Sequence, residues 1–220
     1  CGVCHSDLHL QDGYFDLGGG NKLDVQAGRT LPFTLGHEIA GVVEAVGPDA
    51  KGVEVGKRYA AYPWIGCGKC GVCARGDEHL CNAPRALGVT VDGGYATHVL
   101  VPHPRYLFEV GNLPSEQAAP LACSGITAYS ALKKVGAQVL KEEPIVIIGA
   151  GGVGLMGLTL AKAMGGEGKY IVYVGSLTVP LHNKWADAAI ALQKEKYPNM
   201  GLVADRFGVA ESMDDSYKTA

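Results

Sequence analysis

The sequence predicts an α/β protein in which a mostly β N-terminal part precedes an α/β part. Residues 1 to about 120 contain short apolar runs bounded by glycine- and proline-containing turns, which is typical of β structure. From about residue 121 helical patterns alternate with apolar runs, and one run leads directly into a glycine-rich loop. This alternation is the pattern of β-α-β units and a parallel sheet. The predicted domains are therefore residues 1–120 and residues 121–220.

Three strands are expected in the first part. They are residues 39–46, 57–62 and 95–101. The first is a valine-rich run bounded by Gly36 and a turn at residues 47–49, and a turn at residues 92–94 leads into the last. The three consecutive glycines from Gly18 predict a flexible loop.

The second part should begin with a short helix at Ser115 and a longer one over residues 126–135. Residues 145–148 have no polar alternation, which is typical of a strand buried on both faces of a parallel sheet. After the glycine loop we expect further elements in alternation. They are a helix to about residue 164, a strand at 170–174, a helix from residue 181 to about 196, a strand at 201–207 and a last helix opened by a capping box at Ser212.

Composition narrows the class of protein. The chain has 220 residues, of which 47% are apolar and 19% are charged, as in a folded soluble protein. Its net charge of −3 and the lack of a basic block predict neither nucleic acid nor an anionic membrane as a partner. No apolar run reaches the length of a membrane span. The odd count of 7 cysteines, most of them clustered, favours metal-bound thiolates in a reducing compartment, hence the cytoplasm, over a disulfide framework.

Four cysteines form a compact pattern, C-x2-C-x2-C-x7-C. They are Cys67, Cys70, Cys73 and Cys81. Four thiolates at this spacing are the ligand set of a closed, tetrahedral, structural zinc site. The alternatives are apolar core cysteines or disulfides, but the surrounding residues Lys69, Arg75 and Glu78 do not suit a core.

The loop after residues 145–148 reads G-x-G-x-x-G and opens a helix, which is the context of a dinucleotide-binding loop. Gly149 would permit the turn, Gly151 the approach of the pyrophosphate, and Gly154 close packing of helix on strand. The expected cofactor-binding residues are Gly149, Gly151, Gly152, Val153 and Gly154. The alternative is a plain tight turn between a strand and a helix.

Three further residues have ligand chemistry but lie far apart in the sequence. They are Cys4, His37 and Cys123. Two thiolates and an imidazole with an open fourth position would make a catalytic zinc site. Taken singly, Cys123 before a helix is more often a core residue, and His37 is equally well a hydrogen-bonded core histidine. Spacing alone does not join them.

Several motifs in order resemble the zinc-dependent medium-chain alcohol dehydrogenases. Gly36-His37-Glu38, followed by Gly41 and Gly47, matches the zinc signature G-H-E-x2-G-x5-G of that family. The four-cysteine pattern, the segment at residues 92–96 and the loop at residues 149–154 also match. The resemblance covers residues 1 to about 168. It implies a GroES-like catalytic domain, truncated at its start, followed by a partial Rossmann dinucleotide-binding domain.

The resemblance also implies roles for individual residues. Cys4, His37 and Cys123 would bind the catalytic zinc, and Glu38 would lie beside the metal. Ser6 would touch the substrate oxygen and His9 would pass the proton outward, while Asp7 would support a ligand.

The implied activity interconverts an alcohol and its aldehyde or ketone by hydride transfer to a nicotinamide cofactor. NAD is expected and NADP stays open, with two zinc ions per chain. The partners would be a small-molecule substrate and further copies of the chain in a dimer or tetramer. Neither the particular alcohol nor the exact oligomer is specified by the sequence.

The resemblance ends near residue 168. An acid after the second strand of such a fold would hold the adenosine ribose of NAD, but no Asp, Glu or Arg occurs between Lys169 and Trp185. Residues 173–185 and 203–207 instead resemble the bacterial sugar-binding proteins of ABC transporters. A fusion, a wrongly or incompletely assigned stretch of sequence, or a diverged dehydrogenase would each explain the change, and the first two are favoured.

Two alternative functions follow from this change of resemblance. One is a sugar-binding module or fusion in which the dehydrogenase part is an inactive, zinc-holding passenger. The other is an inactive zinc-holding scaffold. The chain opens inside a motif, at Cys1, and ends inside a predicted helix, so we expect it to be part of a longer polypeptide.

Overall fold

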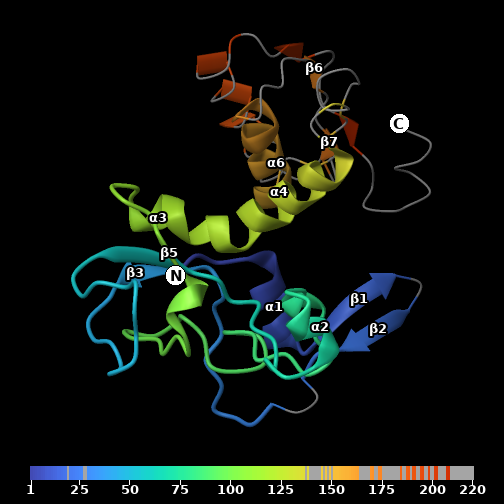
Figure 1. Ribbon diagram of the computed structural model, residues 1–220. Helices are drawn as coiled ribbons and strands as arrows, with labels where there is room; N and C mark the ends of the chain where they lie inside the picture. Colours follow the sequence, from blue (N-terminus) through green and yellow to red (C-terminus); the bar gives the residue numbers. More distant parts are fainter. Residues whose placement is uncertain are drawn as a thin grey trace. The chain divides into compact units, whose positions relative to one another are not determined.

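The computed structural model describes residues 1–18, 20–26, 29–136 and 151–163, together with residues 138, 145, 147 and 149 and short pieces between 169 and 208. The chain divides into two compact units, Cys1–Cys123 and Ser124–Ala220. In Figure 1 the first unit runs from blue to green and the second continues through yellow and orange. None of the described helices is long and apolar enough to cross a membrane.

The first unit begins with helix α1 (His5–Asp12), which the sequence patterns did not predict. The carboxylate of Asp7 accepts a hydrogen bond from the backbone N–H of Cys4 at 2.9 Å, which satisfies one of the free donors at the start of the helix. The helix ends at Gly13, whose φ of 89° lies in the left-handed region and whose N–H binds the carbonyl of His9. This short helix carries Ser6, Asp7 and His9.

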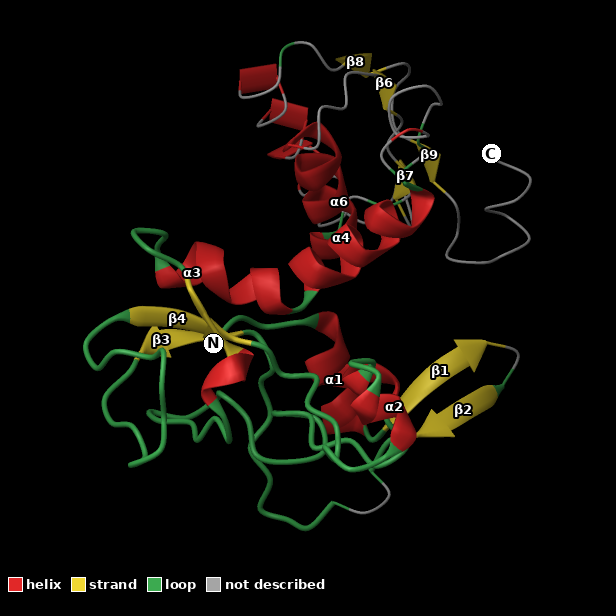
Figure 2. Ribbon diagram, viewed as in Figure 1, coloured by secondary structure: helices red, strands yellow, loops and turns green. Residues whose placement is uncertain are grey.

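An antiparallel hairpin follows, made of β1 (Tyr14–Gly18) and β2 (Asn21–Asp24). Figure 2 shows it as a pair of yellow arrows beside α1. Of the glycines expected to form a flexible loop, Gly18 is the last residue of β1 and Gly20 lies in the turn. All residues of β2 are exposed, so the strand lacks the alternation of buried and exposed residues that would have predicted it.

The core of the first unit lies on a three-stranded antiparallel sheet in the order β3 (Ile39–Val42), β4 (Arg58–Ala61), β5 (Leu107–Glu109). β4 is the central strand, and Tyr59, Ala60 and Ala61 are all buried. The buried core cluster consists of Ile39, Ala61, Ile65, Leu87 and Tyr106. The predicted strands at 39–46 and 57–62 are confirmed, although the first ends at Val42.

The strand predicted at residues 95–101 is wrong, because no residue of this stretch belongs to a strand. The backbone donors that lead into it pair with the loop before His37: the N–H of Gly94 binds the carbonyl of Gly36 and that of Tyr95 binds Leu35. The chain bends at residues 94–97 instead of extending along a sheet edge.

Short helical segments complete the first unit. They are α2 (Gly71–Ala74), η1 (Glu78–Leu80), η2 (Pro104–Tyr106), α3 (Ser115–Ala118) and η3 (Ala119–Ala122). The helix predicted at Ser115 is confirmed as α3.

The second unit contains two described helices that pack together, α4 (Ser124–Val135) and α6 (Gly152–Ala163). Figure 2 shows them side by side. Both confirm predicted helices, and α4 begins two residues before the expected residue 126. Of the strand predicted at 145–148, residues 145 and 147 are described and are not in a strand, while 146 and 148 lie outside the described residues.

Two parallel pairs of short strands support the predicted α/β character of this unit. β6 (Lys169–Tyr170) pairs with β8 (Gly201–Leu202), and β7 (Tyr173–Val174) pairs with β9 (Phe207–Gly208). The described residues of the helix predicted at 181–196, such as Lys184 and Asp187, are helical. The last helix predicted from Ser212 lies outside the described residues.

Candidate metal centres

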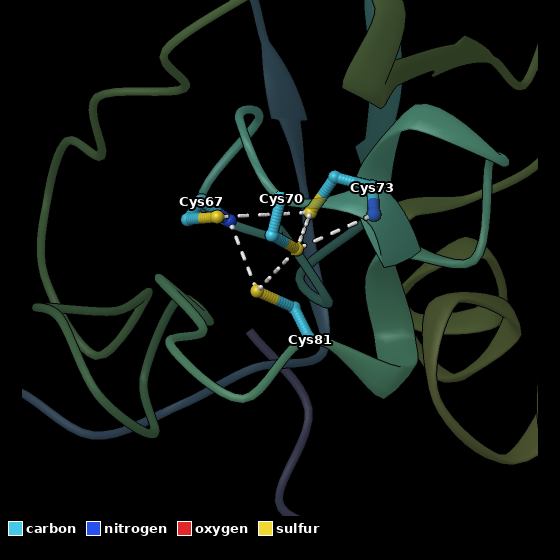
Figure 3. Close-up of side chains that lie close together, drawn as sticks. All are labelled: Cys67, Cys70, Cys73 and Cys81. Carbon is cyan, nitrogen blue, oxygen red and sulfur yellow. Dashed lines mark hydrogen bonds between the residues drawn. The ribbon is translucent and has the colours of Figure 1, made fainter.

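The four cysteines of the sequence pattern converge on one point. Figure 3 shows Cys67, Cys70, Cys73 and Cys81 with their side chains directed toward one another, and their sulfurs all lie within 4.8 Å. Three of the sulfur–sulfur distances are 3.5, 3.8 and 3.9 Å. With zinc–sulfur bonds of about 2.3 Å, the corners of a tetrahedron lie about 3.8 Å apart. The spacing of these thiols therefore suits a tetrahedral zinc ion.

Local backbone geometry brings the four thiols together. Cys70 precedes α2 and its sulfur accepts the backbone N–H of Cys73 at 3.5 Å, so two ligands lie on one turn of helix. Gly68 has a φ of 75°, which permits the tight turn between the first two ligands. Cys81 follows η1 and is buried.

The electrostatics of this cluster favour partial ionisation. Backbone N–H groups of Lys69 and Cys70 lower the pKa of Cys67 to about 6. Burial raises the pKa of Cys73 to about 11. A cluster that holds some thiolates and some thiols could bind a cation and release the remaining protons, which is how a zinc site forms.

Glu78 ties this cluster to the rest of the first unit. Its carboxylate accepts hydrogen bonds from the backbone N–H of Gly66 at 3.0 Å and from the hydroxyl of Tyr106 at 2.7 Å, and it pairs with Arg105 at 2.6 Å. The hydrogen bond from Tyr106 lowers the pKa of Glu78. Tyr106 belongs to the buried core, so the loop of cysteines is anchored to the sheet.

Cys4, His37 and Cys123 form a second cluster, with one ligand atom from each lying within 4.8 Å of the others. The two sulfurs are 3.8 Å apart and the Cys123 sulfur is 3.4 Å from Nε2 of His37. Cys4 precedes α1, His37 precedes β3 and Cys123 follows η3, so the fold joins residues that are up to 119 positions apart. His37 is fully buried, at 0% exposure.

The charges in this cluster are strongly coupled. Hydrogen bonds from Cys123 and His37 lower the pKa of Cys4 to about 3. The Cys4 thiolate in turn raises the pKa of Cys123. Burial disfavours the charged form of His37, but the thiolate of Cys4 and the carboxylate of Asp7 outweigh it and raise the histidine pKa. The three side chains thus share protons among themselves, and a bound zinc ion would displace these protons.

Asp7 organises two of these three residues. It is 3% exposed, and its Oδ1 lies 3.0 Å from Nδ1 of His37. Its other oxygen accepts the backbone N–H of Cys4 at 2.9 Å and the hydroxyl of Tyr95 at 2.8 Å. A carboxylate at Nδ1 directs Nε2 of the imidazole toward the sulfurs, as in known metal sites.

The remaining expected residues lie around this cluster. Glu38 is 6% exposed and lies beside Cys123. Burial and the nearby Cys4 thiolate raise the pKa of Glu38. The backbone and the side chain of Ser6 also lower the pKa of Cys4. His9 has no described contact with the three ligands, since its ring lies against Phe15 at 4.7 Å and against His5.

A cavity of about 330 Å³ opens beside His37. Its lining is mostly apolar, with few polar groups. The lining residues are Ser6, Leu10, Phe15, Val25, Arg29, His37, Trp64, Val89 and Thr90. The ring of Trp64 lies 5.5 Å from that of His37. A cavity with a mostly apolar wall and a few polar groups, which include the imidazole of His37 and the hydroxyl of Ser6, suits a small organic molecule.

The glycine loop opens α6. Gly149 has a φ of 99°, and a side chain at Gly154 would place its Cβ only 1.9 Å from the carbonyl oxygen of Gly149. Gly151 and Gly152 are exposed, with open space where a Cβ would stand. The exposed backbone at the start of a 12-residue helix suits the binding of phosphate groups.

Residues 1–112 match the family described as the alcohol dehydrogenase GroES-like domain, which covers just over half of the chain. The chain belongs to this family. The resemblance stated from the motifs is thereby confirmed.

Curated relatives extend the match beyond the GroES-like domain. The NAD-dependent alcohol dehydrogenase of Sulfurisphaera tokodaii is 47% identical over 166 residues, covering 75% of this chain and 46% of the relative. An alcohol dehydrogenase of Geobacillus stearothermophilus is 40% identical over 167 residues, covering 75% and 46%. The chain thus spans about half the length of the curated relatives it matches.

Solved structures support the same architecture, a GroES-like domain followed by part of a Rossmann domain. The D-arabinose dehydrogenase of Sulfolobus solfataricus has a TM-score of 0.70 at 28% identity and covers 99% of this chain and 59% of its own. The alcohol dehydrogenase of Aeropyrum pernix has a TM-score of 0.64 at 32% identity and covers 85% and 52%. The resemblance of residues 173–185 and 203–207 to sugar-binding proteins concerns residues that mostly lie outside those described.

Two residues of this family member were not assigned a role from the sequence. Tyr95 lies in the matching segment at residues 92–96, but its contact with Asp7 spans 88 positions and has no sequence signal. Trp64 follows a buried proline at residue 63 and faces His37, and its type alone does not distinguish a cavity wall from a core residue.

Proposed function

We propose that this chain is the zinc-binding catalytic domain and part of the dinucleotide-binding domain of an alcohol dehydrogenase. The enzyme would interconvert an alcohol and its aldehyde or ketone by hydride transfer to NAD. The observation that carries this proposal is the convergence of Cys4, His37 and Cys123 beside an apolar cavity. The NAD-dependent names of the relatives from Sulfurisphaera tokodaii and Saccharolobus solfataricus favour NAD over NADP.

The two donor sets found among the described residues suit zinc ions with different purposes. The four-cysteine cluster offers four sulfurs and therefore suits a closed structural ion. The other cluster offers two sulfurs and one nitrogen, which leaves a position for substrate. An ion held there would act as a Lewis acid that lowers the pKa of an alcohol hydroxyl.

The residues of α1 would handle the proton of the alcohol. Ser6 lines the cavity, so its hydroxyl can accept the proton of a bound alcohol. His9 lies three positions further on the same helix, on the side of Ser6, and it is half-buried. We assign it the transfer of this proton toward solvent. Glu38 would support the ligand Cys123, which lies beside it.

The cavity wall would position the carbon chain of the substrate. The apolar side chains of Leu10, Phe15 and Val89 would limit the access of water to it, and the ring of Trp64 would restrain that of His37, which it contacts. A nicotinamide cofactor supplies the acceptor for hydride in this reaction class. Gly149, Gly151, Gly152, Val153 and Gly154 would bind its pyrophosphate through the backbone at the start of α6. We further propose a cytoplasmic homo-oligomer, a dimer or a tetramer, on the family resemblance.

Zinc content and alcohol-dependent formation of NADH test the proposal together. We expect His37→Ala to lose the zinc ion of the three-ligand site (Cys4, His37 and Cys123) and to lose turnover. The variant should retain the zinc ion of the four-cysteine site (Cys67, Cys70, Cys73 and Cys81). His98→Ala is the matched control, because the His98 side chain is 72% exposed and faces Glu44 rather than either cluster. Turnover by His37→Ala at the rate of the control would refute the assignment.

A further inference from the structure

Tyr95 is far in sequence from Asp7, yet its side chain contacts this residue beside the three-ligand site. Its hydroxyl donates to Asp7 at 2.8 Å, although the tyrosine is 41% exposed and the aspartate only 3%. Neither residue is one of the three ligands. The hydrogen bond therefore connects an accessible loop to the buried carboxylate that faces His37.

The loop that carries Tyr95 is fixed to the segment that carries His37. The backbone N–H groups of residues 93, 94 and 95 donate to the carbonyls of Thr34, Gly36 and Leu35 at 2.8, 2.8 and 3.0 Å. The backbone N–H of Thr34 donates to the side chain of Asp92 at 2.8 Å. These four hydrogen bonds run in both directions, so the two segments hold one another in register.

The ring of Tyr95 is fixed as well as its backbone. A Cβ at Gly36 would lie 2.7 Å from the tyrosine ring, so the ring lies directly across this glycine. Gly36 has a φ of 98° and immediately precedes His37. The position of the tyrosine is thus set by the residue next to the ligand.

The two carboxylate oxygens of Asp7 have different hydrogen-bond partners. Oδ1 faces Nδ1 of His37, while Oδ2 accepts both the Tyr95 hydroxyl and the backbone N–H of Cys4. Two donors on Oδ2 restrain rotation of the carboxylate. This restraint keeps Oδ1 in line with the imidazole, whose Nε2 then points toward Cys123 at 3.4 Å.

We propose that Tyr95 is a positioning residue for the three-ligand site: its hydroxyl fixes the Asp7 carboxylate, which orients His37 and the backbone of Cys4. This inference rests on the proposed function, because it takes Cys4, His37 and Cys123 as ligands of a metal ion. Tyr95 acts only through Asp7 and contacts neither metal nor substrate. Partners behind metal ligands typically contribute 10- to 100-fold to affinity.

The first test is the affinity of the three-ligand site for Co²⁺ in Tyr95→Phe, followed by ligand-field absorption and competition with a chelator. Phenylalanine keeps the ring across Gly36 and removes only the hydroxyl. We expect affinity to fall by about 10-fold at this site, with no change at the four-cysteine site. Tyr129→Phe is the matched control, because Tyr129 is exposed on α4.

The second test is a double-mutant cycle with Asp7→Asn. If the tyrosine acts through the carboxylate, Tyr95→Phe should weaken Co²⁺ binding in the parent chain but add little in the Asp7→Asn background. The ring-nitrogen NMR signals of His37 should also move in Tyr95→Phe and not in the control. Fully additive effects, or Tyr95→Phe binding Co²⁺ with parent affinity and an unchanged spectrum, would overturn the role of Tyr95 and leave the proposed function intact. Absence of Co²⁺ from the three-ligand site of the parent chain would overturn both.

Discussion

Gly154 and Gly157 lie three residues apart in α6, yet alanine at these positions should change stability in opposite directions. A Cβ at Gly154 would lie 1.9 Å from the backbone carbonyl oxygen of Gly149. A Cβ at Gly157 would meet the side chains of Ile147 and Ala128 at 3.6 and 3.9 Å, which are ordinary contact distances. The same substitution therefore clashes with a backbone atom in one case and makes ordinary side-chain contacts in the other.

The expected magnitudes follow from two opposing terms. Alanine in place of glycine stabilises a helix interior by about 1 kcal/mol, which is the net effect we expect at Gly157. At Gly154 the contact falls roughly 1.5 Å short of van der Waals separation, and relieving such a clash costs about 1–3 kcal/mol or more. Because Gly154 lies in the first turn of α6, replacing it with alanine stabilises the helix by less than the same change does in the helix interior. We expect Gly154→Ala to destabilise the unit by about 1–2 kcal/mol.

Hydrogen exchange of the α6 amides measures this difference locally. Relative to the parent chain, exchange should slow about fivefold in Gly157→Ala and accelerate about tenfold in Gly154→Ala, given that 1.4 kcal/mol is a factor of ten. A fluorescence titration with NADH should show weaker binding to Gly154→Ala, because the shifted loop no longer presents its backbone to the pyrophosphate. Equal or slower exchange in Gly154→Ala than in Gly157→Ala would refute the steric argument.

Two further predictions concern the first unit. Cys70→Ser should lose the zinc ion of the four-cysteine site and lower thermal stability and solubility by far more than Cys1→Ser, since Cys1 is exposed and outside both clusters; normal stability with lost activity would contradict a structural role. His9→Ala should slow turnover more at acidic than at alkaline pH while zinc content stays at the parent level, because only the path of the proton is removed. Release of zinc by this variant would show that the relay role is wrong.

Local patterns predicted well what depends on neighbours in the sequence. The spacing of Cys67, Cys70 and Cys73 within one turn and loop is a property of the sequence itself, and the four sulfurs do converge. The helix after the glycine loop and the strand β4 also follow from local apolar patterns. In these cases the signal and the structure span the same few residues.

Tertiary contacts decided what local patterns could not predict. The stretch at residues 95–101 has strand-forming residues, but hydrogen bonds from Gly94 and Tyr95 to the loop before His37 replace a sheet ladder. Helix α1 has a mostly polar sequence with only Asp7 and Leu10 buried, so no apolar stripe indicated it. From the sequence, only the family resemblance grouped Cys4, His37 and Cys123, because residues so far apart leave no periodic pattern.

The closeness of the thiols also has a consequence for oxidation. In each cluster a sulfur lies 3.5–3.9 Å from another, so the thiols are near enough to be candidates for a disulfide, whose sulfur–sulfur bond is about 2.05 Å long. The same sulfur atoms can then either form a disulfide or bind zinc, but not both. If zinc occupies these clusters as proposed, it would protect the thiols from oxidants, whereas a chain stripped of metal in air would form disulfides that block renewed zinc binding.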